Sequence, residues 1–427
     1  MTLVIGRSSL RLNVPGFLEP EVVECDVSHL LVVGDLAWPE DSIPSVSLAE
    51  DLTSCCSLLP NLEGPILPAQ RPPLASGRWF GLWNSARTVD FLMDMKTRVA
   101  GGAGNHIVDF RGGLEATFTV CRRAGIHIGG AGPSVEHASR PLRVMLPNGF
   151  SVLLYFAGDR RVNCRAPSSK AWGSNLIQPS RDMGLIRMIR SAFPDDMLAV
   201  VLHWGWELQP WPEPGQRRYA AALAAAGVDV LIGHHAHICQ AWEHVDGMTA
   251  FYGIGNFLVR EGFYEAIDVK YPRESSRSVG IMLGASGPRV VHLHADSRRG
   301  LVTQIGTTVP PEDSLLESFA GIGDPGSADY SSFYRKHNTV AWWYPVWSGD
   351  ESRARRVLAE SRLRGVGALK RLRSAATSTQ RRMGPISGSL ASQSAGDVPG
   401  GVDISLGETG TSEGEPRGQR HPRGTGG

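Results

Sequence analysis

The chain is poor in cysteine, in net charge and in long hydrophobic runs. Its 427 residues include only 6 cysteines, which form no CxxC pair and no regular framework. In a chain of this size, such cysteine usage indicates reduced thiols. No segment approaches the roughly 18 apolar residues that a membrane-spanning helix needs, and the N-terminus lacks the pattern of a signal peptide. These absences predict a cytoplasmic protein.

The small net charge predicts no particular polyanionic partner. At pH 7 the formal charge is +1, so we expect no nucleic-acid binding. Basic residues nevertheless outnumber acidic ones after Gly349, in a segment that becomes rich in Ser, Gly and Pro and is typical of disorder. The aromatic segment 338–347 and the basic segment 351–373 either make weak contact with a membrane surface or pack against the body with solvated arginines.

Short apolar runs alternate with helical patterns over the first 300 residues. Strand-like runs include HLLVVGD (29–35), FSVLLYFA (150–157) and MLAVVLHWG (197–205), and helical patterns include SARTVDFLMDMKTRVA (85–100) and QRRYAAALAAAG (216–227). With β-rich segments near the end, this pattern predicts a layered α/β sandwich. We divide the chain into an N-terminal extension (1–27), one domain (28–300), an extension that packs on it (301–348) and a basic, then disordered, tail (349–427).

Side chains of the kinds that bind metals stand where predicted strands end or loops begin. They are Asp35 in VVGD, Asn61 and Glu63 in NLEG, Asn105, His106 and Asp109 in GNHIVDF, His203 and Glu207 in HWGWE, and His234, His235 and His237 in GHHAH. Loops at the carboxyl ends of strands converge on one crevice in an α/β sheet, so these distant residues can meet. Carboxylate, amide oxygen and imidazole together suit Mn, Fe or Zn, whereas an all-oxygen set would suit Mg or Ca.

The order of these motifs resembles that of calcineurin-like metallophosphoesterases: Asp, then Asn-His, then His, then Gly-x-His-x-His. The finer resemblance is to the bacterial capsule-synthesis branch, the CapA or poly-gamma-glutamate biosynthesis family. NLEGPI, GNHIVDF, GIHIGGAG, HWGWE, AGVDVLIGHHAHICQ and YGIGNFL resemble its successive motifs. The resemblance implies a layered α/β/β/α sandwich that holds two divalent metal ions, Mn, Fe or Zn.

The resemblance also implies a role for each matching residue. The first metal would be bound by Asp35 and His237, the second by Asn105, His203 and His235, with Glu63 bridging the two. Four further residues would line the site, beside the ligands or the substrate: Asn61, Glu207, His234 and Asn256. His106 would act as a catalytic acid, oriented by Asp109.

Two positions depart from the wider phosphoesterase pattern. Ala37 stands where a histidine ligand is usual, and Glu63 replaces the usual bridging aspartate. The capsule-synthesis branch shares both features, so they support the narrower resemblance. They also leave the first metal with fewer ligands.

The implied function is a metal-dependent hydrolase of phosphoester-type bonds in capsule or poly-gamma-glutamate biosynthesis, acting on a small or polymeric anionic substrate. Two cations about 3.5–4 Å apart would generate a metal-bound hydroxide, and His106 would protonate the departing oxygen. The alternative is a metal-containing accessory protein that binds an anionic polymer or a synthesis complex without turnover. The missing ligand at Ala37 favours the accessory role, and the Asn-His motif with Asp109 favours the enzyme.

One loop carries cations that the metal site does not use. The segment GDRRVNCRAPSSK (158–170) contains Arg160, Arg161, Arg165 and Lys170. Loops of this length are often functional. These side chains either meet an acidic substrate or remain solvated.

Overall fold

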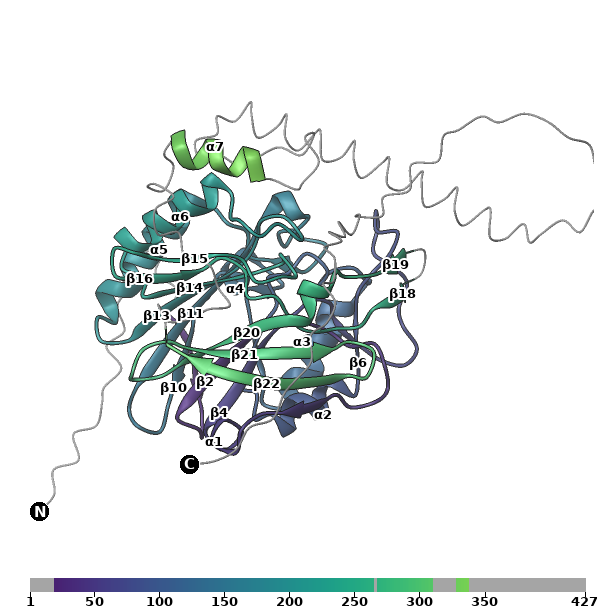
Figure 1. Ribbon diagram of the computed structural model, residues 1–427. Coiled ribbons are helices and arrows are strands. Elements are labelled where there is room, and N and C mark those ends of the chain that lie inside the picture. The colour runs from purple at the N-terminus through teal and green to yellow at the C-terminus, as the bar shows by residue number, and fades with distance from the viewer. Residues whose placement is uncertain (1–18, 265–266, 310–327, 338–427) are drawn as a thin grey trace, which may run out of the picture. The chain divides into compact units, whose positions relative to one another are not determined.

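Residues 19–264, 267–309 and 328–337 are described by this computed structural model (Figure 1), and all of them belong to one unit, Met1–Arg381. The predicted tail (349–427), the aromatic segment (338–347) and the basic segment (351–373), with the membrane contact suggested for them, lie outside the described residues. Within the described ranges, none of the helices is long and apolar enough to cross a membrane.

The first sheet has the strand order β1-β10-β11-β13-β14-β16-β15 within the described residues. Its centre consists of parallel strands β11 (Ser151–Gly158), β13 (Met197–His203) and β14 (Val230–His234). The outer strands are β1 (Glu21–Glu24), β10 (Leu142–Met145), β16 (Met248–Phe251) and β15 (Trp242–Val245). The central strands are buried on both faces, which explains why they read as continuous apolar runs.

The second sheet has the order β3-β22-β21-β20-β2-β4-β7-β8, and β17 pairs with the end of β2. Its parallel part is β2 (His29–Ala37), β4 (Cys56–Leu62), β7 (Val99–Gly101), β8 (His127–Gly129) and β17 (Asn256–Val259). Antiparallel strands β20 (Arg277–Leu283), β21 (Arg289–Asp296) and β22 (Leu301–Thr308) follow, with β3 (Ser45–Ser47) at the edge. The late β-rich segments of the sequence therefore extend the sheet that contains β2.

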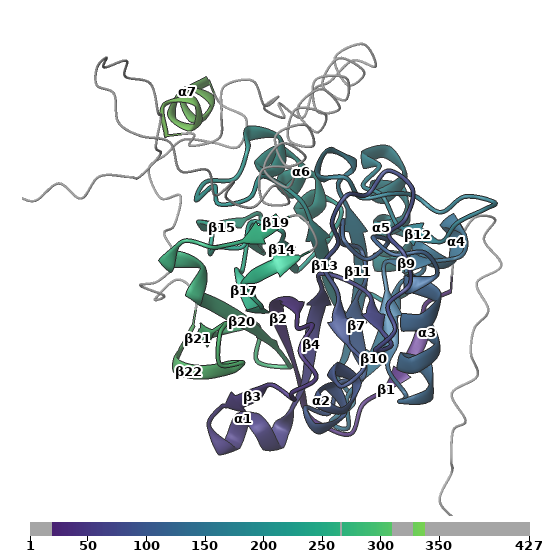
Figure 2. The ribbon, with the colours of Figure 1, turned by 90° about the vertical axis from the view of Figure 1, so that its right-hand side faces the viewer.

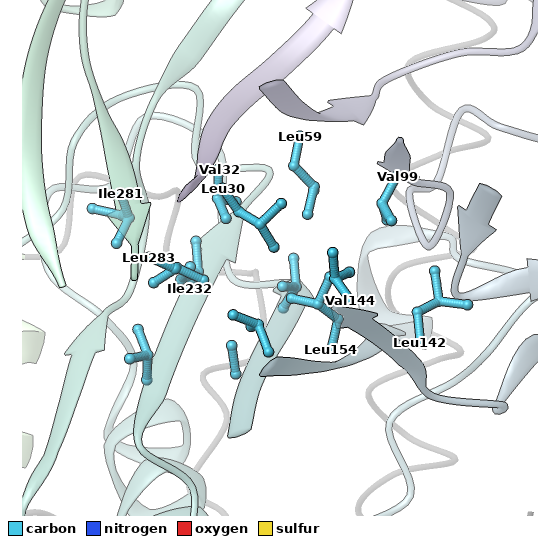
Figure 3. Packing of buried hydrophobic residues seen from close by; sticks show 14 of the residues in the cluster. Leu30, Val32, Leu59, Val99, Leu142, Val144, Leu154, Ile232, Ile281 and Leu283 are labelled. Carbon is cyan, nitrogen blue, oxygen red and sulfur yellow. The ribbon is translucent and has the colours of Figure 1, made fainter. Parts of the chain in front are cut away.

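The two sheets face each other across a hydrophobic core. Leu30, Val32 and Leu59 of one sheet lie opposite Leu154 and Ile232 of the other (Figure 3). All five side chains are at most 1% exposed, and burial of each stabilises the fold by about 1.5–3 kcal/mol. This core holds the two sets of parallel strands together.

Helices cover the outer faces of both sheets (Figure 2). The helices α1 (Glu50–Cys55), α2 (Thr88–Asp94) and α3 (Gly113–Arg123) pack on the sheet of β2. The helices α5 (Pro179–Ala192) and α6 (Pro214–Ala225) pack on the sheet of β13, and α7 (Ala328–His337) packs against α6. The short elements are β5 (Ile66–Leu67), β6 (Asn84–Ser85), β9 (Ala131–Gly132), α4 (Val135–Ala138), η1 (Arg160–Val162), β12 (Gly173–Ser174), β18 (Gly262–Tyr264), β19 (Ile267–Val269) and η2 (Arg273–Ser276). The predicted layered α/β/β/α sandwich is confirmed.

The helix predicted over 85–100 is wrong in its second half. The helix α2 ends at Asp94, Lys96 has a positive φ of 53°, and Val99 already lies in β7. Strand β7 lies between β4 and β8 in the sheet. Pairing with these two neighbours outweighs the local helical pattern.

The sheets extend on both sides of the range 28–300. Strand β1 lies in the predicted N-terminal extension and pairs with β10 of the first sheet. Strand β22 lies after residue 300 and pairs with β21 of the second sheet. The helix α7 packs near α6, where the Tyr330 hydroxyl donates to Pro212 O over 2.7 Å. The guanidinium of Arg217 lies 4.2 Å from the centre of the Tyr330 ring.

Candidate metal centre

The carboxyl ends of parallel strands from both sheets meet at one edge of the sandwich. Asp35 of β2 is the register partner of Asn61 in β4 and of Asn256 in β17. His203 and His234 end β13 and β14 and are themselves register partners. This is the edge of an α/β fold where functional loops converge.

A glycine before Asp35 allows β17 to approach β2 closely. A Cβ atom on Gly34 would lie 2.0 Å from the carbonyl oxygen of Gly255. Only glycine tolerates such an approach of one backbone to another. The VVGD motif thereby places Asn256 beside Asp35.

Asp35 is fully buried and links the strand ends to the GHHAH loop. Its Oδ1 accepts a hydrogen bond from Asn61 Nδ2 over 2.7 Å, and its Oδ2 accepts one from the His235 backbone N–H over 3.2 Å. Nδ1 of His234 lies 3.4 Å from Oδ1, and Nδ1 of His237 lies 3.3 Å from Oδ2. One carboxylate therefore holds two chain segments that are far apart in the sequence.

The GHHAH loop adopts an unusual backbone conformation. His235 and His237 have positive φ angles of 84° and 57°, a region that residues other than glycine rarely occupy and that costs about 1–3 kcal/mol each. The bend places the centres of the His235 and His237 rings 5.9 Å apart. The centre of the His203 ring lies 4.8 Å from the centre of the His235 ring. The strain is consistent with a loop that is held in place for function.

Several buried polar atoms at this edge have no hydrogen-bond partner among the residues that the structure describes. They are Oε1 of Glu63, both ring nitrogens of His234 and Nδ1 of His235. An unsatisfied buried polar atom costs about 1–3 kcal/mol. Ligand atoms of Glu63, His203 and His235 lie within 4.8 Å of one another, and those of Glu207, His235 and His237 form a second such group. The donor set and its unsatisfied atoms fit divalent cations of the kind that imidazole and carboxylate bind together.

The protonation states also suit cation binding. Burial lowers the pKa of His235 to about 4 and that of His203 well below the ordinary 6.5, so both rings are neutral near pH 7 and keep a lone pair for a metal. Burial, together with the charge of Asp35, raises the pKa of Glu63. Burial would also raise the pKa of Asp35, but the side chains of His234 and His237 outweigh it and lower that pKa.

The metal-free protein should lose stability on acidification because of His235. Its pKa is about 4 in the folded chain and 6.5 ordinarily, so between these pH values only the unfolded chain takes up the proton. The stabilising contribution is present above pH 6.5 and is lost as the pH falls to 4, by roughly 3 kcal/mol. Urea unfolding with a chelator, compared between the wild type and His235→Ala, should show the difference in unfolding free energy shrinking by this amount. A difference independent of pH would contradict a neutral, buried His235.

His106 lies in a chain of charged partners. Its Nδ1 is 2.5 Å from Asp109 Oδ2, and Asp109 Oδ1 is 2.9 Å from Nε of Arg78. Arg78 also donates from Nη2 to the carbonyl oxygen of Asn105 over 2.6 Å. Asp109 thus orients His106, with Nε2 of the ring left for another partner.

The side-chain amides of Asn105, Asn61 and Asn256 contact histidine rings of the site. Asn105 Oδ1 lies 2.8 Å from His203 Nε2, and Asn61 Nδ2 lies 3.3 Å from His203 Nδ1. Asn256 Oδ1 lies 2.7 Å from His237 Nδ1, so Nε2 of that ring is the nitrogen not occupied by this contact. These amides orient the two imidazoles.

The structure places the predicted site residues as follows. Those that are at most 7% exposed and gathered at this edge are Asp35, Asn61, Glu63, Asn105, His106, Asp109, His203, His234, His235, His237 and Asn256. Glu207 is exposed, yet it shares a potential metal-binding group with His235 and His237. The role of Glu207 in lining the site stays a prediction.

Two residues at the site were not predicted. The Tyr271 ring lies 4.8 Å from that of His237, and burial together with the charges of Glu207 and Glu63 raises its pKa well above the ordinary 10.0. Arg78 binds Asp109. Neither residue stands in a recognisable motif, so no sequence signal could have identified them.

The cations of the loop 158–170 divide into two kinds. Arg161 is partly buried and forms ion pairs with Asp159 and Glu213 that join the loop to the start of α6. Its role is structural. Arg160, Arg165 and Lys170 are exposed.

Comparisons with known proteins give the following matches. A profile of the family described as "Bacterial capsule synthesis protein PGA_cap" matches residues 47–261. The PGA biosynthesis protein CapA of Bacillus subtilis is 26% identical over 49% of this chain and 54% of its own length. The capsule biosynthesis protein CapA of Bacillus anthracis is 28% identical over 39% of this chain and 41% of its own length. A probable polyglutamine synthesis accessory protein of Mycobacterium tuberculosis is 28% identical over 40% of this chain and 47% of its own length.

The chain therefore spans about half the length of the curated relatives that it matches. Among solved structures, a 5'-nucleotidase precursor from Thermus thermophilus matches with a TM-score of 0.32 and 12% identity, over 68% of this chain and 53% of that one. The NAD nucleotidase of Haemophilus influenzae matches with a TM-score of 0.27 and 9% identity, over 59% and 52%.

Proposed function

This chain belongs to the bacterial capsule synthesis protein family PGA_cap, and on that premise we propose that it is a metal-dependent hydrolase of phosphoester-type bonds in capsule or poly-gamma-glutamate biosynthesis. The observation that carries the proposal is the group of buried imidazole and carboxylate atoms of Glu63, His203 and His235. Of these residues, His235 also has a strained backbone with a positive φ of 84°. Oε1 of Glu63 and Nδ1 of His235 have no hydrogen-bond partner among the described residues, and such atoms are suited to bind a cation.

The residues that would hold metal are those at the strand ends. One ion would be bound by Glu63, Asn105, His203 and His235, and the other by Asp35 and His237, with Glu63 between them and Glu207 nearby. Divalent cations bound here would supply positive charge that polarises a phosphoryl oxygen and acidifies water.

The chain's own chemistry centres on His106. With Nδ1 held by Asp109, the ring presents Nε2 for a proton that it donates to the departing oxygen of the substrate. Arg78 holds Asp109 in turn. A divalent ion used only for structure would not require such a proton donor.

We further propose that Arg165 binds an anionic group of the substrate. Its Nη1 donates to Ser76 O over 3.2 Å, and in the part of the chain that the structure describes no carboxylate lies within ion-pair distance of it. Although Arg165 is an exposed residue, partial desolvation of its guanidinium lowers its pKa, and the nearby guanidinium of Arg78 adds to this, whereas Asp109 opposes it. An anion between the two guanidinium groups would relieve their repulsion.

Replacing Arg165 with glutamine should raise KM about tenfold and leave kcat nearly unchanged, because the lost contact exists in both ground and transition states. Steady-state kinetics on the preferred ester would measure both constants. The matched control is Arg160→Gln, an exposed arginine of the same loop, which should leave KM unchanged. Equal effects of the two substitutions would indicate general surface charge instead of a binding contact.

The proposed hydrolase can be tested with generic substrates. Purified protein would be stripped with a chelator, reloaded with Mn²⁺, Fe²⁺ or Zn²⁺, and assayed on an aryl phosphate monoester and an aryl phosphate diester. Hydrolysis that disappears with the chelator and returns with the metal supports the proposal. Full metal occupancy without turnover of either ester would contradict it.

The second candidate is a metal-containing accessory protein that binds an anionic polymer or a synthesis complex. Ala37 favours it, since this buried residue of β2 offers no ligand where the wider phosphoesterase pattern has a histidine. Metal-dependent binding of a poly-gamma-glutamate chain without turnover of any ester would support it.

The cytoplasmic location predicted from the sequence stays a prediction.

A further inference from the structure

A second group of metal-binding side chains lies at the other end of β2. Ligand atoms of His29, Cys55 and Cys56 lie within 4.8 Å of one another. His29 begins β2, the strand that carries Asp35 near its far end, and it is the register partner of Cys56 in β4. This group is therefore separate from the candidate metal centre.

The change from helix to strand brings the two sulfur atoms together. The helix α1 ends at Cys55, and Cys56 begins β4 with φ −113° and ψ 141°. Within a strand, successive side chains point to opposite faces. Here the two Sγ atoms lie 3.7 Å apart.

A third sulfur and an imidazole complete the surroundings. Met282 of β20 has its Sδ 3.7 Å from Cys56 Sγ, and Nδ1 of His29 lies 2.9 Å from the Ser28 hydroxyl. Thiol, thioether and imidazole are the donors that thiophilic metals prefer over Mg or Ca. Cys55 and His29 are partly exposed, so an ion can reach the group from solvent.

We propose that His29, Cys55 and Cys56, with Met282 beside them, form a second metal site for a thiophilic cation of the Cu(I) or Zn²⁺ class. The bound ion would join α1, β2 and β4 and so stabilise this end of the sandwich. Because a metal ion binds the thiolate form of cysteine, binding must release protons and become tighter as the pH rises.

Cadmium is a suitable probe, because Cd²⁺–thiolate bonds give an ultraviolet charge-transfer band that oxygen and nitrogen ligands do not. The reduced full-length protein should show this band on titration with Cd²⁺, with stronger absorption at higher pH. His235→Ala should keep the band, because that residue lies in the other site. This makes the test independent of the proposed hydrolase.

Three substitutions locate the site. Cys55→Ser should reduce the band by about half and weaken Cd²⁺ binding more than about tenfold, and His29→Gln should weaken binding by about tenfold while keeping the band. The matched control is Cys239→Ser, since Cys239 has the same intermediate exposure as Cys55 but belongs to another part of the fold. The control should bind Cd²⁺ like the wild type.

Two results would overturn the proposal. One is a wild-type protein without a charge-transfer band. The other is a band that Cys55→Ser leaves unchanged, which would place the thiolate ligand elsewhere, at Cys239 if Cys239→Ser removes it. Cys55 is partly exposed and its serine variant is conservative, so circular dichroism should show a folded protein in either case.

Discussion

Replacing Asp35 with alanine is expected to lower affinity for divalent metal more than about 100-fold, beyond the 10–100-fold range for groups that only orient a ligand, and to abolish metal-dependent hydrolysis. Asp35 is fully buried among His234, His235 and His237. Its removal takes away a charge that attracts the cation and the contacts that hold the GHHAH loop.

The two contributions of Asp35 can be separated. Asp35→Asn removes the charge but keeps one oxygen acceptor, which can receive the hydrogen bond of either Asn61 or the His235 backbone N–H. It should therefore keep more of the loop contacts than Asp35→Ala and still bind metal poorly. Metal content by elemental analysis and affinity by competition with a chelator would measure the effect. Asp41→Ala, at an exposed position, is the control and should bind metal normally. Wild-type metal affinity in Asp35→Ala would remove Asp35 from the ligand set.

His106→Gln is expected to lower turnover about 10²–10⁴-fold, the range for loss of general acid catalysis, while metal content stays at the wild-type level. In the structure, His106 contacts Asp109 and is not part of either potential metal-binding group at this edge. Loss of metal together with activity would show that His106 has another role.

The leaving group provides a sharper test of His106. An alkyl ester releases a strongly basic oxygen that needs a proton, whereas a nitrophenyl ester releases one that needs it much less. The loss of turnover in His106→Gln should therefore be larger for the alkyl ester. The control is His127→Gln, because His127 forms a similar contact outside the candidate metal centre. Its Nδ1 lies 2.6 Å from Oε1 of Glu21. That variant should keep wild-type kinetics on both esters.

Sequence patterns predicted the layered fold and the residues that gather at one sheet edge. They could do so because apolar runs mark the strands and each functional motif follows such a run, as Asp35 follows HLLVVG. They failed for the second half of 85–100, where Val99 pairs with β8 and the helix has already ended at Asp94. They also left Arg161 open between solvent and substrate, and the structure pairs it with Asp159 and Glu213.

The sequence alone determined which donor types the protein carries, their order and their place at strand ends, because composition and periodicity are local properties of the chain. Only the tertiary structure decided which atoms meet. The left-handed backbone at His235 and His237, the contact of Asp109 with Arg78, and the approach of His29 to Cys55 and Cys56 all depend on packing between distant segments. Such packing minimises the free energy of the whole fold, so no single stretch of sequence contains it.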